Sequence, residues 1–181
     1  MQDSYHRYLK GDDTGIAEIV TAYREGLILY ACNFTGSMTA AEDLVDDVFF
    51  RLMIKKPHFS GRISFKTWLY TMTRHRAIDD LRRQKRNPTV SVDEIQELAD
   101  KKQLEESYIR KEQQIAIYRA LNQINASYQL VLYLSFFEDF DNAQIAAILG
   151  KSKRQVEMLK YRGLQALKKE LEKEGLSDEI L

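Results

Sequence analysis

Cationic and aromatic side chains are interleaved over residues 65–83, a composition suited to binding single-stranded nucleic acid. Lys and Arg neutralise phosphates, and unpaired bases stack on aromatic rings. Trp68 is expected to pack in the core rather than to offer a stacking surface. His75 and Asp79 lie four residues apart, a spacing that also permits metal chelation. Because the chain has only three histidines and no third ligand stands near this pair, we predict neither a metal site nor a cofactor.

A second constellation, over residues 141–161, has the spacing of a helix-turn-helix. Asp141 and Ser152 each precede a Gln by three residues (Gln144 and Gln155), which is the capping-box pattern that begins a helix. Gly150 tolerates the left-handed backbone that a tight turn between two helices commonly needs. The apolar residues expected to hold the two helices together are Ile145, Ala146, Leu149, Val156 and Leu159.

The outward residues of the second helix of this motif are candidates for reading duplex DNA. In a major groove, Lys and Arg bond guanine or phosphate, Gln suits adenine and Glu suits cytosine. The residues in this position are Ser152, Lys153, Arg154, Gln155, Glu157, Met158, Lys160 and Tyr161. An ordinary helical hairpin with a polar outer face is the alternative, but the full set of apolar and glycine spacings favours DNA binding.

Acidic residues recur at three- to four-residue spacing between residues 42 and 47, so they share one face of a helix. They are Glu42, Asp43, Asp46 and Asp47. Carboxylates on a regular exposed helix seldom converge on one metal ion, which disfavours a metal site. On the residues alone, a solvated face and a docking surface for a basic partner both stay open.

Helices must carry all of these residues, because apolar side chains recur at helical spacing and strand-like alternation persists nowhere. The pair Thr39 and Glu42 has the capping-box spacing and predicts the start of one helix. Pro57 predicts the end of that helix near Lys56, since proline disfavours helical geometry in the residue before it. A loop follows over residues 58–64, and the cationic and aromatic segment forms the next helix.

Charge divides the chain of 181 residues into two parts around an acidic stretch. The formal net charge is zero, yet residues 62–86 and 151–169 are basic and residues 93–106 are acidic. We therefore predict an all-α protein of two small helical domains joined by a flexible linker, with the helix-turn-helix in the C-terminal domain. The predicted boundaries are 1–88 for the first domain, 89–107 for the acidic linker, 108–175 for the second domain and 176–181 for the tail.

The sequence also predicts a cytoplasmic protein without a disulfide. Cys32 is the only cysteine, so no internal disulfide can form. No apolar run approaches the roughly 18–20 residues that cross a bilayer, so we expect no membrane segment. The N-terminus lacks the apolar stretch of a signal peptide.

These motifs, in this order, resemble regions 2 and 4 of the extracytoplasmic-function (ECF) subfamily of bacterial RNA polymerase sigma factors, within the sigma-70 family. The residues that carry the resemblance are Ala41-Glu42-Asp43-Leu44-Val45, Val48-Phe49-Phe50-Arg51-Leu52, Phe65 to Tyr70 and Arg76 to Arg83 for region 2, and Ala120-Leu121, Ile145-Ala146, Leu149-Gly150, Val156 and Leu167 for region 4. The resemblance implies a sigma factor, not an enzyme, which directs promoter recognition and transcription initiation together with core RNA polymerase.

The resemblance implies three binding surfaces. Core polymerase would be bound by Glu42, Asp43, Asp46, Asp47, Phe50 and Arg51. The −10 element, both as duplex and as melted non-template strand, would be bound by Phe59, Ser60, Arg62, Lys66, Thr71, Arg74, His75, Asp79, Arg82 and Arg83. The outward residues of the helix-turn-helix would read the −35 element. An anti-sigma factor is a further expected partner.

Some residues depart from the family pattern, and two other functions stay open. The departures are Asp46 where Gln is usual, His75 where Asn is usual, Asn125 where Pro is common, Gln144 where Glu is common, and Arg162-Gly163-Leu164 in place of Arg-Ala-Arg.

One rival function is a conventional helix-turn-helix regulator that binds duplex DNA without core polymerase. The other is a helical metal-dependent phosphohydrolase that uses His75, Asp79 and Asp80.

Overall fold

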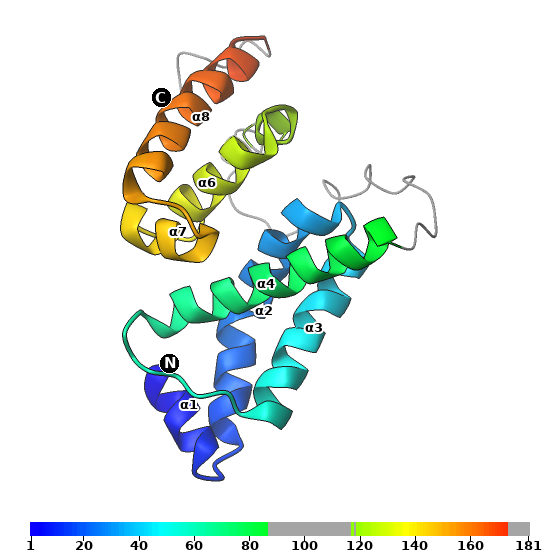
Figure 1. Ribbon diagram of the computed structural model, residues 1–181, viewed down its shortest axis with the longest axis vertical. Coiled ribbons are helices and arrows are strands. Elements are labelled where there is room, and N and C mark those ends of the chain that lie inside the picture. Colours follow the sequence, from blue (N-terminus) through cyan, green and yellow to red (C-terminus); the bar gives the residue numbers. More distant parts are fainter. Residues whose placement is uncertain (87–116, 118, 174–181) are drawn as a thin grey trace, which may run out of the picture. The chain divides into compact units, whose positions relative to one another are not determined.

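The computed structural model describes residues 1–86, 117 and 119–173. The predicted linker at 89–107 and the predicted tail at 176–181 lie outside these described residues. All regular secondary structure in the described ranges is helical, as predicted (Figure 1). The chain divides into two compact units. No described helix is both long and apolar enough to span a membrane.

In the described residues, the first unit contains four helices, and α2 lies at its centre. They are α1 (Gln2–Leu9), α2 (Thr14–Thr35), α3 (Met38–Lys55) and α4 (Phe65–Arg86). Helix α2 packs against the other three, and α4 crosses both α2 and α3 (Figure 1). The side chains of Ile19, Leu27 and Tyr30 on α2 are fully buried, as are Leu52 on α3 and Leu69 on α4.

The start of α3 differs from the prediction, whereas its end agrees. Ser37, not Thr39, is the N-cap, and its hydroxyl accepts a hydrogen bond from the Ala40 N–H. The capping-box reading of Thr39 and Glu42 was therefore wrong by two residues. Helix α3 ends at Lys55, and Lys56 takes a left-handed φ of 40° just before Pro57.

Helix α1 was not predicted, because its apolar face consists only of two tyrosines and a small polar residue. Tyr5 is 0% exposed and Tyr8 is 7% exposed, so both phenol rings lie in the core. Ser4 is buried beside α2, where the backbone carbonyl oxygen of Ser4 lies against Gly15. A Cβ atom at Gly15 would come within 2.1 Å of that oxygen, so the approach of the two helices requires glycine.

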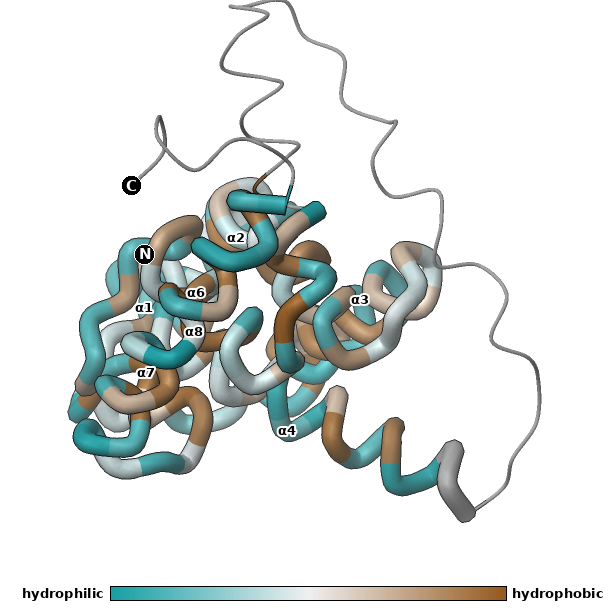
Figure 2. The backbone as a smooth tube through the Cα atoms, turned by 90° about the horizontal axis from the view of Figure 1, so that it is seen from above, coloured by the Kyte–Doolittle hydropathy of each residue, from teal (hydrophilic) through white to brown (hydrophobic). Residues whose placement is uncertain are grey.

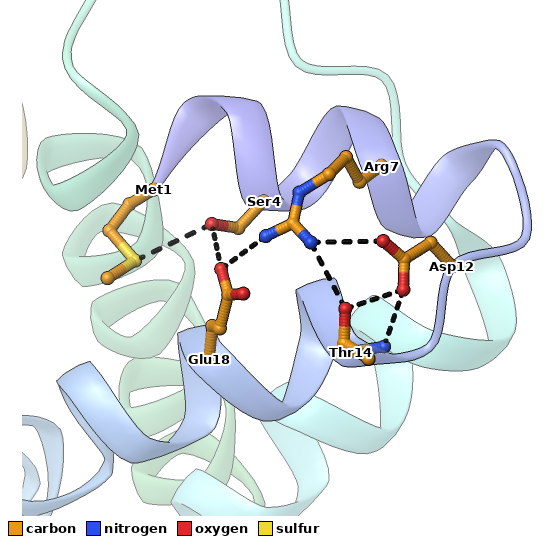
Figure 3. Close-up of polar contacts among 6 residues, drawn as sticks. All are labelled: Met1, Ser4, Arg7, Asp12, Thr14 and Glu18. Atoms are coloured by element: carbon orange, nitrogen blue, oxygen red, sulfur yellow. Dashed lines mark hydrogen bonds and ion pairs between the residues drawn. The ribbon is translucent and has the colours of Figure 1, made fainter.

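A polar cluster on the surface ties α1 to the start of α2 (Figure 3). The Arg7 guanidinium donates to Asp12 (3.0 Å), to Thr14 (3.1 Å) and to Glu18. The Ser4 hydroxyl donates to the same Glu18 carboxylate at 2.7 Å. Hydrogen bonds from Arg7 hold the pKa of Glu18 below its usual range, and bonds from Thr14 do the same for the pKa of Asp12.

In the second unit, α6 (Ala126–Phe136), α7 (Asn142–Leu149) and α8 (Lys153–Lys173) contain the predicted helix-turn-helix. The buried residues in the core of the second unit include Ala120, Leu121, Leu132, Leu167 and Leu171. Along α4, hydrophilic and hydrophobic stretches follow one another, which fits a helix that buries one face (Figure 2).

The cluster between α1 and α2 should make the stability of the first unit depend on acid pH. The lowered pKa values of Asp12 and Glu18 mean that their contribution is complete above the ordinary carboxyl range, about pH 4, and is lost as the pH falls through the lower folded values. We expect Glu18→Gln to lower the thermal unfolding midpoint at neutral pH. The difference between variant and wild type should shrink on acidification, and a difference that stays constant would contradict this account.

Candidate nucleic-acid interface

Two reciprocal capping boxes begin α7 and α8, as the sequence predicted. The Asp141 N–H donates to the Gln144 side chain (2.9 Å), while the Gln144 N–H donates back to the Asp141 carboxylate (2.8 Å). The Ser152 N–H and the Gln155 side chain make the same exchange at 2.8 Å, and the Gln155 N–H returns to the Ser152 hydroxyl at 3.2 Å. Gly150 has the left-handed φ of 62° that the turn needs.

The first two turns of α8 expose most of the residues predicted to read duplex DNA. Lys153, Arg154 and Glu157 are exposed, and Met158 and Tyr161 are 45% and 67% exposed. On the opposite side of the helix, Val156 is fully buried. The helix therefore presents two cations, one carboxylate and two apolar side chains to solvent, which is a suitable set for phosphates, base edges and thymine methyl groups.

Lys160 lies differently from the other predicted readers. Its ammonium donates to the Ser135 hydroxyl of α6 at 2.6 Å and stands 5.0 Å from the centre of the Phe136 ring. These contacts come from a helix that precedes α8 by many residues, so the outward position on α8 alone did not reveal them. Lys160 thus connects α8 to α6 through these two contacts.

The predicted −10 surface is basic along the exposed face of α4. His75, Arg82 and Arg83 are exposed, and Arg74 is half-buried. Ser60 and Arg62 are exposed in the loop before α4, and the Lys66 ammonium stands 5.7 Å from the centre of the Tyr70 ring. Thr71 differs, because its hydroxyl donates to the Thr67 carbonyl of the same helix at 2.7 Å.

Phe59, which was predicted to contact the −10 element, is buried in this structure. It is only 7% exposed and packs edge-on against Phe65 (5.5 Å) and at a tilt against Trp68 (5.1 Å), with Tyr5 of α1 in contact with the same two rings. An apolar ring gains more from burial in this aromatic cluster than from solvent. Phe59 thus anchors the loop over residues 57–64, and the cluster includes Trp68, as predicted.

The acidic face of α3 is divided between free and paired carboxylates. Asp43 is exposed and has no ion-pair partner in the described ranges, whereas Asp46 pairs with Arg24 at 3.2 Å. Asp47 is half-buried, forms an ion pair with Arg51 at 2.8 Å, and accepts a hydrogen bond from Arg76 of α4. The prediction placed Asp47 and Arg51 on a docking surface, but the structure uses the Asp47 carboxylate to join α3 to α4.

Arginines also form ion pairs with the two aspartates that the phosphohydrolase hypothesis requires. Asp80 accepts from Arg76, and Asp79 lies 3.7 Å from Arg82. No group of three metal-binding side chains gathers within the part of the chain that the structure describes. The phosphohydrolase hypothesis therefore has no support from the geometry of His75, Asp79 and Asp80.

A shallow apolar groove of about 450 Å³ runs between α2 and α3, beside the acidic face of α3. Its lining residues are Val20, Asp46, Asp47, Phe49, Phe50 and Met53. Phe50 is 58% exposed and Ile54, one turn further along α3, is 67% exposed. Sequence reasoning missed Val20, Met53 and Ile54. The signal for Ile54 was present, because Phe50 and Ile54 lie four residues apart and outside the buried stripe of α3.

Removing the Arg76 side chain should destabilise the first unit more than removing a neighbouring arginine. The Arg76 side chain is 16% exposed and its loss leaves the carboxylates of Asp47 and Asp80 close together without their shared cation. We expect Arg76→Met to lower the free energy of unfolding by about 2 kcal/mol. Arg82→Met, whose side chain is 71% exposed, should change it by less than about 0.5 kcal/mol. Equal effects in urea unfolding would contradict the role given to Arg76.

Comparison with known proteins identifies both units. The family model for Sigma-70 region 2 matches residues 19–87, and the model for Sigma-70 region 4 matches residues 114–167. The ECF RNA polymerase sigma factor SigX of Bacillus subtilis is 30% identical over 166 residues, which cover 87% of this chain and 86% of the relative. The ECF RNA polymerase sigma factor SigW of the same organism is 25% identical over 171 residues, or 90% and 91% of the two chains.

Two solved structures share the fold. The sigma factor RpoE of Bartonella quintana, in complex with the anti-sigma factor NepR, superposes with a TM-score of 0.67 at 19% identity, covering 86% of this chain and 96% of that one. CnrH, in complex with the cytosolic domain of CnrY, gives a TM-score of 0.64 at 19% identity, covering 93% and 95%.

Proposed function

This chain belongs to the extracytoplasmic-function sigma factors of bacterial RNA polymerase, and from that premise we propose how its two units divide promoter recognition. As a sigma factor it directs transcription initiation. We propose that the first unit, within residues 1–88, binds core polymerase and the −10 element, that residues 89–107 connect the units, and that the second unit, within residues 108–175, binds the −35 element.

We propose that core polymerase docks on the groove between α2 and α3 and on the acidic residues beside it. The exposed Phe50 ring and the apolar groove would be buried by such a partner. Asp43 supports a basic counterpart, since it is exposed and unpaired within the described residues. Asp46 would also bind core polymerase after giving up its ion pair with Arg24. Breaking that pair costs little, because it is exposed to solvent.

For strand opening, we propose that the loop over residues 57–64 and the exposed face of α4 hold the melted non-template strand. Ser60, Arg62 and His75 are exposed in these two elements. Unstacking a base costs a few kcal/mol, which contacts with the extruded base and its phosphates can offset. Because Phe59 is buried, base capture would use the rim of the loop and not the Phe59 ring.

For the −35 element, we propose that α8 lies in the major groove with its first two turns against the bases. The exposure of Arg154 and Glu157 on the face opposite Val156 supports this orientation. Each interaction would be weak alone, and linking two DNA-binding units raises the effective concentration of the second contact. Simultaneous binding therefore favours promoters that carry both elements.

The observation that carries the proposal is the occurrence of both family regions, in order, on a structure whose exposed residues fit each task. A conventional regulator is not favoured, because the region 2 match accounts for the whole of α3 and α4. We propose that the protein performs no catalytic step of its own and acts in the cytoplasm, where RNA polymerase works. We also propose regulation by an anti-sigma factor, which would cover the same apolar groove.

Run-off transcription with purified core polymerase on genomic promoter fragments tests this function. We expect specific transcripts only when the protein is present. Arg154→Ala should reduce them at least about tenfold, the loss expected for one or two base or phosphate contacts. Asp43→Arg should reduce them by weakening the binding of core polymerase.

Matched controls separate these effects from general loss of charge. Lys168→Ala and Glu172→Arg change exposed residues further along α8 and should leave transcription unchanged. Duplex binding by the free protein, without core association and without transcripts, would instead establish the conventional regulator.

A further inference from the structure

Helix α1 contacts both flanks of the loop over residues 57–64. The Tyr5 hydroxyl donates a hydrogen bond of 2.7 Å to the Pro57 carbonyl, where the loop begins. The Tyr5 ring also packs against Phe65 (5.4 Å) and Trp68 (5.6 Å), where the loop ends and α4 starts. One fully buried side chain thus joins the two ends of the loop. Burial raises the pKa of Tyr5 to about 12, so the hydroxyl keeps its proton as a donor.

A second tyrosine of α1 holds the end of α3. The Tyr8 hydroxyl donates to the Met53 carbonyl at 3.0 Å, a carbonyl in the last turn of the helix. The Lys56 ammonium stands 4.7 Å from the centre of the Tyr8 ring, at the residue whose left-handed φ of 40° turns the chain into the loop. Helix α1 therefore contacts the chain just before the loop as well as the loop itself.

Helix α1 is in turn fixed on the opposite side by α2. Arg7 and Ser4 both bond the Glu18 carboxylate (Figure 3), and Gly15 allows the Ser4 backbone to touch α2. The chain of contacts runs from α2 through α1 to Pro57. The region 2 match begins at residue 19, so α1 lies outside the matched segment.

We propose that α1 is a positioning element for the −10 loop, and that Tyr5 is the residue through which it acts. This inference rests on the proposed role of the loop in capturing the melted strand. Side chains that bind an extruded base must be held to within about half an ångström, and loops reach that accuracy only when packed elements support them. The loop over residues 57–64 has such support in the Tyr5 hydrogen bond and ring contacts.

Tyr5→Phe removes the hydrogen bond to Pro57 and leaves the ring in the aromatic cluster. An ordinary hydrogen bond corresponds to roughly a fivefold change in an equilibrium. The assay uses polymerase holoenzyme and a duplex promoter found by the run-off experiment. On this promoter we expect the variant to give roughly fivefold less transcript and lower permanganate reactivity of the promoter thymines. On the same promoter melted beforehand across the −10 element, we expect less than about twofold change, because strand opening is no longer required. Binding of core polymerase should be unchanged.

Tyr23→Phe is the matched control. Tyr23 is half-buried and its ring lies 6.2 Å from Phe65, but no described residue hydrogen-bonds to its hydroxyl. Its loss should leave transcription from the duplex promoter unchanged. Gly15→Ala is an independent variant, because a Cβ would meet the Ser4 carbonyl and displace α1 without altering any residue of the loop. It should reproduce the same pattern, with loss on the duplex promoter and none in the binding of core polymerase.

Two outcomes would overturn the proposal. One is a Tyr5→Phe protein that opens the duplex promoter as well as Tyr23→Phe does. Another is an equal loss on duplex promoter, melted promoter and core binding, which would mean that Tyr5 only stabilises the fold. Absence of specific transcripts with the wild-type protein would overturn the sigma assignment itself, and so is distinguished from failure of the α1 proposal.

Discussion

The first unit depends on the burial of α2 among three other helices. Ile19, Leu27 and Tyr30 lose all contact with solvent there, and burying an aliphatic side chain such as Ile19 or Leu27 contributes about 1.5–3 kcal/mol. Because α2 fills the interior, α3 and α4 each bury one face against it and leave the other exposed. The acidic and apolar residues of α3 and the cations of α4 lie on those exposed faces, so the division into core and binding surface follows from one packing constraint.

The same constraint determines which charged residues are free for partners. Where α3 and α4 approach each other, Asp47, Arg76 and Asp80 neutralise one another, and their burial would be costly without that pairing. Asp43 and Arg83 lie on exposed faces, away from that approach, and stay accessible. Charged residues near the crossing of α3 and α4 thus stabilise the fold by pairing with one another and are less available to partners. Composition alone does not separate the two groups, since all of them share the same helical spacing.

Most features governed by neighbouring residues were predictable from the sequence, although the start of α3, capped by Ser37, was not. Pro57 fixed the end of α3, and the pairs Asp141–Gln144 and Ser152–Gln155 fixed the starts of α7 and α8, because each signal and its effect lie within three residues. Features governed by distant residues were not predictable. Nothing local indicates that Phe59 turns into the core, since its partners belong to α4 and α1. The contacts of Lys160 with α6 were missed for the same reason, whereas α1 was missed because its buried face consists of two tyrosines and a serine.

The departures from the family pattern in the second unit preserve local geometry. Gln144 replaces the common Glu, yet its side-chain oxygen accepts the same N–H of Asp141 that a carboxylate would. Asn125 replaces the common Pro, and its side chain caps α6 by accepting from the Ser127 N–H at 2.9 Å.

Gly163 takes the place of Ala where α8 meets α6, and a Cβ there would lie 3.2 Å from Leu132 and from Tyr128. The glycine therefore permits a closer approach of these two helices than alanine would without movement of its neighbours. Because α6 also holds Lys160, the distance between α6 and α8 determines how Lys160 lies relative to the exposed cations of α8. Gly163 thus affects the packing of α8 against α6, the helix that also holds Lys160.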